Sequence, residues 1–312
     1  MEQVKKQTLA SIYKELRLLI ASLRPKQWSK NLIIYFSFFF AINKLWDPDN
    51  LGSITIPFFQ ATMAFFIFCG ISGVIYLIND WMDLEQDRAH PVKRNRPLAS
   101  NQLSLYVAIA GITLLTITCL TSAIFISPLF LVASTTYLFL MVLYSLVIKR
   151  IAILDVATIS TGFVLRAAAG AVAIGVPVSP WLYITTSLGA LFIGFGKRRN
   201  ELHLGGLEAE HQRSSLGSYS EKLLNRLLTS TALATIISYV LYTVTAGNLP
   251  GNHTMVLTIP LVIFGVLRYL YLIRRRNLGE SPEDVFLSDI PLILSILLWL
   301  ATAASVLLFY GT

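Results

Sequence analysis

Residues 57–78 read PFFQATMAFFIFCGISGVIYLI and contain no charged side chain. About 20 apolar residues in a helix cross the hydrocarbon core of a bilayer, so this run predicts a transmembrane helix. Further apolar runs predict spans at roughly 31–42, 103–124, 128–148, 151–174, 181–196, 224–246, 254–273 and 287–310. Most runs are longer than the strands of about 10 residues that build membrane barrels, and they do not alternate in polarity. The sequence therefore predicts an all-α polytopic membrane protein with nine spans.

The composition agrees with a membrane protein and excludes other classes. Of the 312 residues, 55% are hydrophobic and 13% are charged, whereas soluble globular proteins carry about 25% charged residues. These values exclude an ordinary soluble enzyme, a disordered chain and a disulfide scaffold. No loop has the composition of a linker, so we interpret residues 1–312 as one integral-membrane domain.

The basic residues are distributed unequally between the two predicted sides of the membrane. Of the 25 lysine and arginine residues, 23 lie in the N-terminal segment and in every second loop, while the opposite loops hold only Lys44. Cytoplasmic loops carry an excess of Lys and Arg. We therefore expect a multi-pass protein of the inner (plasma) membrane with a cytoplasmic N-terminus and an external C-terminus. This topology explains the net charge of +8 without a nucleic-acid partner.

The N-terminal segment, residues 1–27, has apolar side chains at helical spacing. They share one helical face and are Leu9, Ile12, Leu16, Leu19, Ile20 and Leu23. This pattern predicts an amphipathic helix on the cytoplasmic membrane surface. The alternative is a frayed basic tail.

Two long cytoplasmic loops are expected at 79–102 and 197–223, and the first begins with NDWMDLEQDRAHPVKRNRP, residues 79–97. Asp80, Asp83 and Asp87 are spaced so that one helix would place all three carboxylates on one face. Mg²⁺ binds a few carboxylates and completes its coordination with water and substrate phosphates. The spacing therefore predicts a magnesium site; the alternative is a solvated loop that ends a helix.

A basic cluster follows the aspartates directly and consists of Lys93, Arg94 and Arg96. Charge-assisted hydrogen bonds from such side chains are strong ligands for phosphate oxygens. An acidic face beside a basic cluster predicts a site for a magnesium-bound diphosphate.

The fifth predicted span contains two ionisable residues, Asp155 and Arg166. Eleven residues correspond to about three helical turns, so both face the same direction. Charged side chains at membrane depth usually line a polar cavity. We therefore expect Arg166 to face a substrate phosphate, with a structural ion pair to another helix as the alternative. Further candidates are Lys30 and Asn31 at the first span and Lys149 and Arg150 in the fourth loop, where snorkelling to the interface is the alternative.

The motif NDxxDxxxDRxHPxKRxRP, with LRPKQWSKN at residues 23–31, resembles the UbiA superfamily of intramembrane prenyltransferases. The resemblance extends over nearly the whole chain. It implies nine helices around a central cavity open to the cytoplasm. It also implies that the motif residues Asn79 and Arg88 belong to the substrate site and that Mg²⁺ is the cofactor.

The second long loop departs from the better-known aromatic prenyltransferases of this family, which have a second aspartate-rich motif there. Residues 196–202 read GKRRNEL, with three bases and one acid. Together with Tyr144, Ser145 and the fifth span, this stretch is similar to family members that transfer phosphoribose to a polyprenyl phosphate. That resemblance implies 5-phosphoribosyl 1-diphosphate (PRPP) as the donor and a polyprenyl-phosphoryl 5-phosphoribose, an arabinan precursor of the cell wall, as the product.

An extra phosphate on the donor requires extra cations, which Lys197 and Arg198 would supply. Glu201 pairs with Lys197 or contributes to a metal. Two other functions stay open: prenyl transfer from a polyprenyl diphosphate to an aromatic acceptor, and transport of phosphate or another anion. A transporter would show inverted repeats, and none is visible in the sequence. A homo-oligomer is also left open.

Overall fold

The computed structural model describes residues 13–177, 179–205, 214–276 and 282–310. These residues form helices and a single isolated bridge between Ile42 and Trp46, and they contain no β-sheet. In chain order the 3₁₀-helices (η) and α-helices are η1 (Pro25–Ile34), α2 (Tyr35–Phe39), α3 (Leu51–Met82), α4 (Leu84–Ala89), η2 (Lys93–Asn95), α5 (Leu105–Ile126), α6 (Pro128–Leu146), η3 (Ile148–Arg150), α7 (Leu154–Ala173), α8 (Pro180–Gly205), η5 (Ser214–Ser218), α10 (Glu221–Thr245), η6 (Thr254–Thr258), α11 (Ile259–Arg276), α12 (Pro282–Ser288) and α13 (Ile290–Tyr310).

The prediction of an all-α polytopic membrane protein is confirmed. Seven helical segments of the described residues are long and apolar enough to cross a membrane: α3, α5, α6, α7, α10, η6 with α11, and α13. The apolar run 181–196 lies in α8, which continues through the following basic residues to Gly205. Residues 197–205 are therefore helical and not part of a loop. Lys197 and Glu201 suit a helix because they are four residues apart and neither breaks it.

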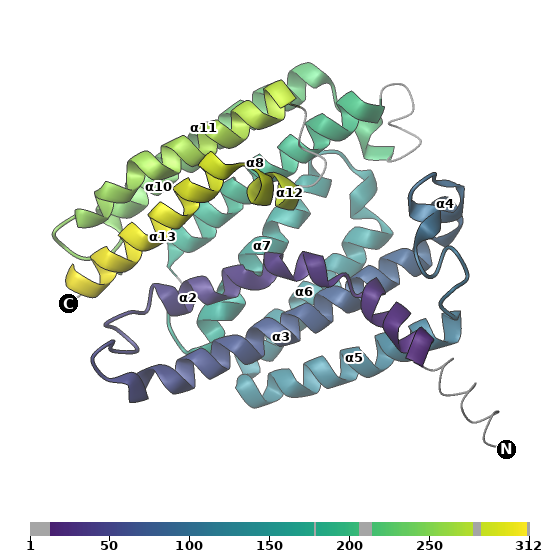
Figure 1. The fold of residues 1–312 in the computed structure, drawn as a ribbon, viewed down its shortest axis with the longest axis horizontal. Helices are drawn as coiled ribbons and strands as arrows, with labels where there is room; N and C mark the ends of the chain where they lie inside the picture. Colours follow the sequence, from purple (N-terminus) through teal and green to yellow (C-terminus); the bar gives the residue numbers. More distant parts are fainter. Residues whose placement is uncertain (1–12, 178, 206–213, 277–281, 311–312) are drawn as a thin grey trace.

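The count of nine spans is not confirmed, because the first predicted span is not one continuous helix. Its residues divide between η1, α2 and the turn that follows. A run from 31 to 42 would rise only about 18 Å as an α-helix, which is short for a core of about 30 Å. η1 and α2 both pack against α3 and α7 (Figure 1). At Gly170 of α7 an added Cβ would lie 2.2 Å from the Ile34 carbonyl oxygen, so only glycine permits this approach.

Local sequence signals explain where several helices begin. Ser127 precedes α6, and its hydroxyl accepts a hydrogen bond of 3.0 Å from the Phe130 amide. Pro128 occupies the first turn, where a missing N–H costs little. Ser220 caps α10 in the same way, accepting from the Leu223 amide at 3.1 Å.

The helices form two packed groups with α7 between them. η1, α3, α5 and α6 lie on one side, where Phe68, Phe130 and Tyr137 form a buried core. α8, α10, α11 and α13 lie on the other, around Phe192 and Tyr269. α7 contacts α6 in the first group and α8 in the second. The groups therefore share α7, which holds both Asp155 and Arg166.

The described ends of the chain lie at opposite ends of the helices (Figure 1). Residues 13–22 are helical beside the end that carries α4, while α13 terminates at the other end. This agrees with an odd number of crossings. Of the amphipathic N-terminal segment, Leu19 and Leu23 pack against a buried cluster, and Leu16 and Ile20 are exposed. Residues 1–12 lie outside the described residues.

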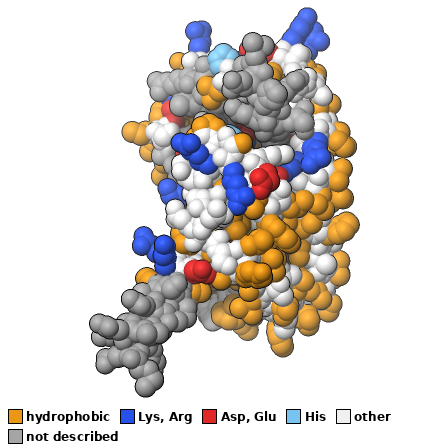
Figure 2. All heavy atoms as spheres, turned by 90° about the vertical axis from the view of Figure 1, so that its right-hand side faces the viewer, with side chains coloured by type: hydrophobic (Ala, Val, Ile, Leu, Met, Phe, Trp, Pro, Cys, Tyr) orange, Lys and Arg blue, Asp and Glu red, His pale blue; other side chains and the backbone are white. Residues whose placement is uncertain are grey.

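Charged side chains gather at the α4 end of the molecule. Figure 2 shows this end, with lysine and arginine side chains spread over it and hydrophobic side chains gathered toward the lower right. Large apolar side chains on the outer helix faces are exposed, among them Phe59, Phe125 and Phe139. Such a surface is suited to contact with lipid tails.

Candidate active site

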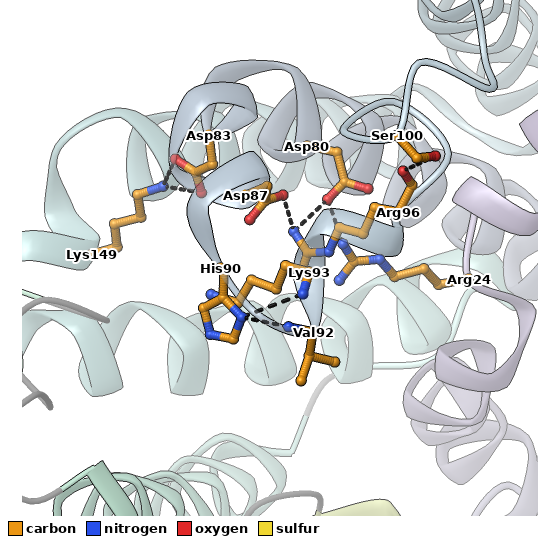
Figure 3. A network of polar contacts seen from close by, with 10 residues as sticks. All are labelled: Arg24, Asp80, Asp83, Asp87, His90, Val92, Lys93, Arg96, Ser100 and Lys149. Carbon is orange, nitrogen blue, oxygen red and sulfur yellow. Dashed lines mark hydrogen bonds and ion pairs between the residues drawn. The ribbon is translucent and has the colours of Figure 1, made fainter.

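The three aspartates lie where α3 leaves the apolar core. Asp80 is in the last turn of α3, and Asp87 is in the short helix α4. Asp83 links the two helices with φ −94° and ψ 14°, so the helix is interrupted there. The prediction that one helical face carries all three carboxylates is therefore wrong. Asp80 and Asp87 converge, whereas Asp83 points to a different neighbour (Figure 3).

Arg96 joins the two converging carboxylates. Its Nη1 donates to Asp80 Oδ1 at 3.0 Å and to Asp87 Oδ2 at 2.5 Å. Arg24, which precedes η1, also donates to Asp80 Oδ1. Both aspartate side chains are only 3% exposed. Buried carboxylates are costly without partners, and these arginines supply them.

Asp83 is neutralised from another part of the chain. Lys149 Nζ on η3 lies 2.6 Å from Asp83 Oδ1 and 2.7 Å from Oδ2. Lys149 was among the sequence candidates, with snorkelling as its alternative, and the structure places it on the aspartate motif. Arg24 was missed. The signal that could have identified it is its position in LRPKQWSKN, next to the family-like residues of the first span.

Lys93 belongs to the first motif and begins η2. Burial, reinforced by the charge of Arg96, lowers the pKa of Lys93 below its usual range. The carboxylates of Asp87, Asp83 and Glu201 oppose this shift. Lys93 therefore lies within electrostatic range of acids from both the first motif and α8.

The remaining predicted residues of the first motif lie at its edge. Arg88 is exposed and donates to Glu85 at 2.9 Å and to Asn101 at 2.8 Å. Arg94 is exposed on η2. The Asn79 carbonyl accepts from the amide of Asp83, the C-cap of α3, at 3.0 Å.

His90, by contrast, shapes the loop. Its Nδ1 accepts from the amides of Val92 and Lys93 at 3.2 and 3.3 Å. Burial and the charge of Lys93 lower the pKa of His90. The neutral ring, which can accept these bonds, is thereby favoured.

A second polar network surrounds Asp155 at the start of α7. Arg198 Nε donates to Asp155 Oδ2 at 2.7 Å, and both side chains are buried. Tyr219 and Ser215 also donate to this carboxylate, at 2.8 and 3.2 Å. Arg198 contacts Glu201 as well. The Arg198 guanidinium is thus bonded to two acids and is not presented to a ligand, contrary to the sequence expectation.

Lys197 stands apart from this buried network. Its side chain is 39% exposed, and Nζ lies 4.0 Å from Glu201 Oε1. The predicted i,i+4 pair therefore exists only as a long contact, while Glu201 bonds to Arg198. Lys197 is the α8 cation that a ligand could reach.

Arg166 has different partners from Asp155, although both belong to α7. Its Nε donates to Asn31 Oδ1 at 2.8 Å, and its Nη2 donates to the Tyr137 hydroxyl. Within the described residues no carboxylate lies within 4.0 Å of it, and the guanidinium instead faces the Tyr137 and Phe163 rings. Asn31 is fully buried on η1, and Lys30 beside it is half-buried. Arg166 thus connects α7 to η1.

A cavity of about 920 Å³ lies toward the end of the helices opposite Asp80. α2, α7, α8, α10 and α13 contribute to its walls, which are rich in aromatic side chains. These include Phe36, Phe40, Trp181, Tyr242 and Trp299. Lys44 contributes a cation to the lining.

Comparison with known proteins places the chain in a family. The profile of the UbiA prenyltransferase family matches residues 33–290. The chain belongs to the UbiA prenyltransferase family. It is similar to decaprenyl-phosphate phosphoribosyltransferase of Mycobacterium tuberculosis, at 31% identity over 290 residues that cover 93% of this chain and 94% of the relative. The enzyme of the same name from Mycolicibacterium smegmatis is 32% identical over 300 residues, covering 93% and 92%.

Solved structures of the UbiA family share the fold. A UbiA homolog from Archaeoglobus fulgidus bound to GPP and Mg²⁺ has a TM-score of 0.70 and 19% identity, covering 93% of this chain and 99% of that one. A second structure of that homolog, bound to DMAPP and Mg²⁺, has a TM-score of 0.68 and 20% identity, covering 94% and 98%. The chain is therefore a membrane-embedded transferase with the UbiA fold.

The donor set of this UbiA-family chain fits Mg²⁺. Within the part of the chain that the structure describes, no three acidic, histidine or cysteine side chains converge as a ready metal cage. Mg²⁺ does not need one, because it commonly takes one or two carboxylates and completes its shell with water and phosphate oxygens. Asp80 and Asp87 already approach one positive atom, Arg96 Nη1. These two carboxylates suit an ion shared with a bound phosphate.

Proposed function

We propose that the protein catalyses Mg²⁺-dependent transfer of 5-phosphoribose from PRPP to a polyprenyl phosphate. Diphosphate leaves, and the product is a polyprenyl-phosphoryl 5-phosphoribose that serves as an arabinan precursor. Relatives named decaprenyl-phosphate phosphoribosyltransferase cover more than nine-tenths of the chain, which supports this activity.

The observation that carries the proposal is the contrast between the two polar networks. The aspartates of the first motif are paired with basic side chains that are 18–29% exposed, whereas Asp155 and Glu201 are both bonded to Arg198, which is only 2% exposed. Around Asp155 and Glu201 the reachable cation is therefore Lys197, and the acids are held in a buried network. A donor with a second phosphate group uses such a cation, whereas the apolar tail of a prenyl diphosphate does not.

In the proposed reaction the acidic segment holds the leaving group. Asp80 and Asp87 would hold Mg²⁺, Asp83 would join them once Lys149 leaves it, and the bound ion would neutralise negative charge on the departing diphosphate. The acceptor phosphate is already anionic and needs no strong general base. The protein contributes positioning and charge stabilisation. Lys93, Arg94, Arg96 and Lys197 would hold phosphate oxygens, with Asn79 and Arg88 supporting the motif.

The lipid acceptor enters from the membrane, with its phosphate at the cytoplasmic end and its chain along the helices. The aromatic-lined cavity suits such a chain. Ala171 lies at the cavity wall, and about 24 Å along the α7 axis separates it from Asp155. Only a long polyprenyl chain would cover that distance. This orientation corresponds to a cytoplasmic N-terminus in the inner membrane, where soluble PRPP is available.

A donor competition assay tests the proposal. Purified protein in detergent receives Mg²⁺, polyprenyl phosphate, an aromatic acid, and either labelled PRPP or labelled prenyl diphosphate. We expect lipid-soluble label from PRPP, only when polyprenyl phosphate is present. Prenylation of the aromatic acid with PRPP untouched would instead establish the prenyltransferase activity suggested by the GPP-bound and DMAPP-bound neighbours.

A further inference from the structure

Every aspartate of the first motif already has a cationic partner. Arg24 and Arg96 contact Asp80, Arg96 also contacts Asp87, and Lys149 contacts Asp83 (Figure 3). Three carboxylates therefore face three permanent or readily protonated cations. Each carboxylate of the cluster is therefore paired with a basic side chain before any metal arrives.

The cations and the carboxylates come from different parts of the chain. The aspartates lie on α3, α4 and the residue between them, whereas Arg24 precedes η1, Arg96 follows η2 and Lys149 lies on η3. The basic side chains therefore do not share a helix with the acids that they contact.

Two of the three carboxylates are less exposed than their basic partners. The side chains of Asp80 and Asp87 are 3% exposed, compared with 29% for Arg24 and 24% for Arg96, whereas Asp83 and Lys149 are exposed to a similar extent, at 22% and 18%. A ligand that reaches this end of the molecule meets Arg24 and Arg96 first. The carboxylates of Asp80 and Asp87 lie behind them.

A divalent ion that arrives alone would have to displace these cations and leave them without counter-ions. Such an exchange is unfavourable where water is scarce. A diphosphate carries more negative charge than one Mg²⁺ neutralises, so a metal–diphosphate complex brings new anions for the displaced side chains.

We propose that metal and diphosphate bind together by an exchange of ion pairs. Arg24, Arg96 and Lys149 pass from the aspartates to the diphosphate oxygens as the metal takes their place on the carboxylates. This inference rests on one part of the proposed function, namely that a diphosphate group binds at the aspartates. It holds for any donor that carries a diphosphate. Arg96 is the central element, because one nitrogen of it occupies the position between Asp80 and Asp87.

Equilibrium dialysis of radioactive Mn²⁺ against the full chain in nanodiscs tests the exchange. Mn²⁺ binding to the protein is measured first without and then with inorganic diphosphate. Diphosphate crosses the dialysis membrane together with any metal that it binds in solution, so only metal held by the protein is retained. For the unmodified protein, we expect diphosphate to tighten Mn²⁺ retention by about tenfold or more. For Arg96→Gln, we expect Mn²⁺ alone to bind about tenfold more tightly and the effect of diphosphate to shrink.

Arg150→Gln is the matched control, because it removes one exposed cation from the same end without a contact to the aspartates. Arg24→Gln provides a second variant in case Arg96→Gln fails to fold, and it should shift Mn²⁺ binding in the same direction. Equal Mn²⁺ affinity with and without diphosphate, or no change in either variant, would overturn the exchange. The probe is inorganic diphosphate, so the two proposals fail separately. A protein that does not use PRPP can still show the exchange, and a protein that uses PRPP can lack it.

Discussion

Arg198 on α8 donates to Asp155 at the start of α7, and the two buried side chains are 2.7 Å apart. This ion pair connects α7 to α8, the helix that also carries Lys197 and Glu201. Asp155 and Glu201 both bond to Arg198 and so belong to a buried network. Lys197, one residue before Arg198, is partly exposed.

Asp155→Ala should destabilise the protein, whereas Lys197→Gln should not. Removing Asp155 takes one acidic partner from the buried Arg198. Breaking a buried ion pair lowers the free energy of unfolding by about 3–5 kcal/mol. Lys197 is partly exposed, so its loss should raise KM for PRPP with little change in melting temperature. Thermal unfolding followed by size exclusion, together with PRPP kinetics, measures both. Unchanged stability in Asp155→Ala would show that the network is not structural.

Asp80→Asn and Asp87→Asn should each lower turnover by about 100-fold or more at ordinary Mg²⁺ concentration. Both carboxylates contact the same atom, Arg96 Nη1, so both would bind the same metal ion. The loss of either one removes a ligand that the other cannot replace. Asp83→Asn should also reduce turnover, through the loss of its carboxylate. Turnover is measured against Mg²⁺ concentration for folded protein. Near-normal activity in the Asp80 or Asp87 variant would place the metal elsewhere.

PRPP binding should weaken at alkaline pH because of Lys93. Burial and Arg96 lower the pKa of Lys93 in the free protein, so its ammonium is lost at a lower pH than that of an ordinary lysine. Only the charged form attracts phosphate, and binding therefore takes up protons near that pKa. KM for PRPP should rise as pH increases through this range. In Lys93→Gln, KM should be higher at neutral pH and its alkaline rise should flatten; identical profiles would exclude a role for Lys93.

Arg166→Lys should lower both stability and turnover although the charge is kept. The guanidinium makes separate bonds to Asn31 and Tyr137 from two nitrogens, and one ammonium cannot reproduce that geometry. Through Asn31, Arg166 fixes η1, which follows Arg24. Tyr137→Phe removes a single bond and should have a smaller effect. If Arg166→Lys behaves like the unmodified protein, Arg166 acts only through its charge, as a phosphate-facing cation would.

Periodic and local features of this fold were predictable from the sequence. Apolar runs identified most long helices, and the spacing of Asp80, Asp83 and Asp87 identified the acidic motif before any geometry was known. The first span was not predictable in detail, because its run is short and its shape depends on packing at Gly170. The basic partners of the aspartates could not be predicted from the sequence either. Arg24 and Asp80 are 56 residues apart in the chain, and Lys149 and Asp83 are 66 apart, so only tertiary structure brings them together.

The most direct test of phosphoribosyl transfer is NMR of the lipid product formed from PRPP and polyprenyl phosphate. In-line attack by the acceptor phosphate on C1 of the α-configured donor inverts that carbon. We expect a β-linked phosphodiester at C1 of a ribose that keeps its 5-phosphate. An α-linked product would contradict direct displacement, and the absence of any phosphoribosyl lipid from active, folded protein would contradict the proposed reaction itself.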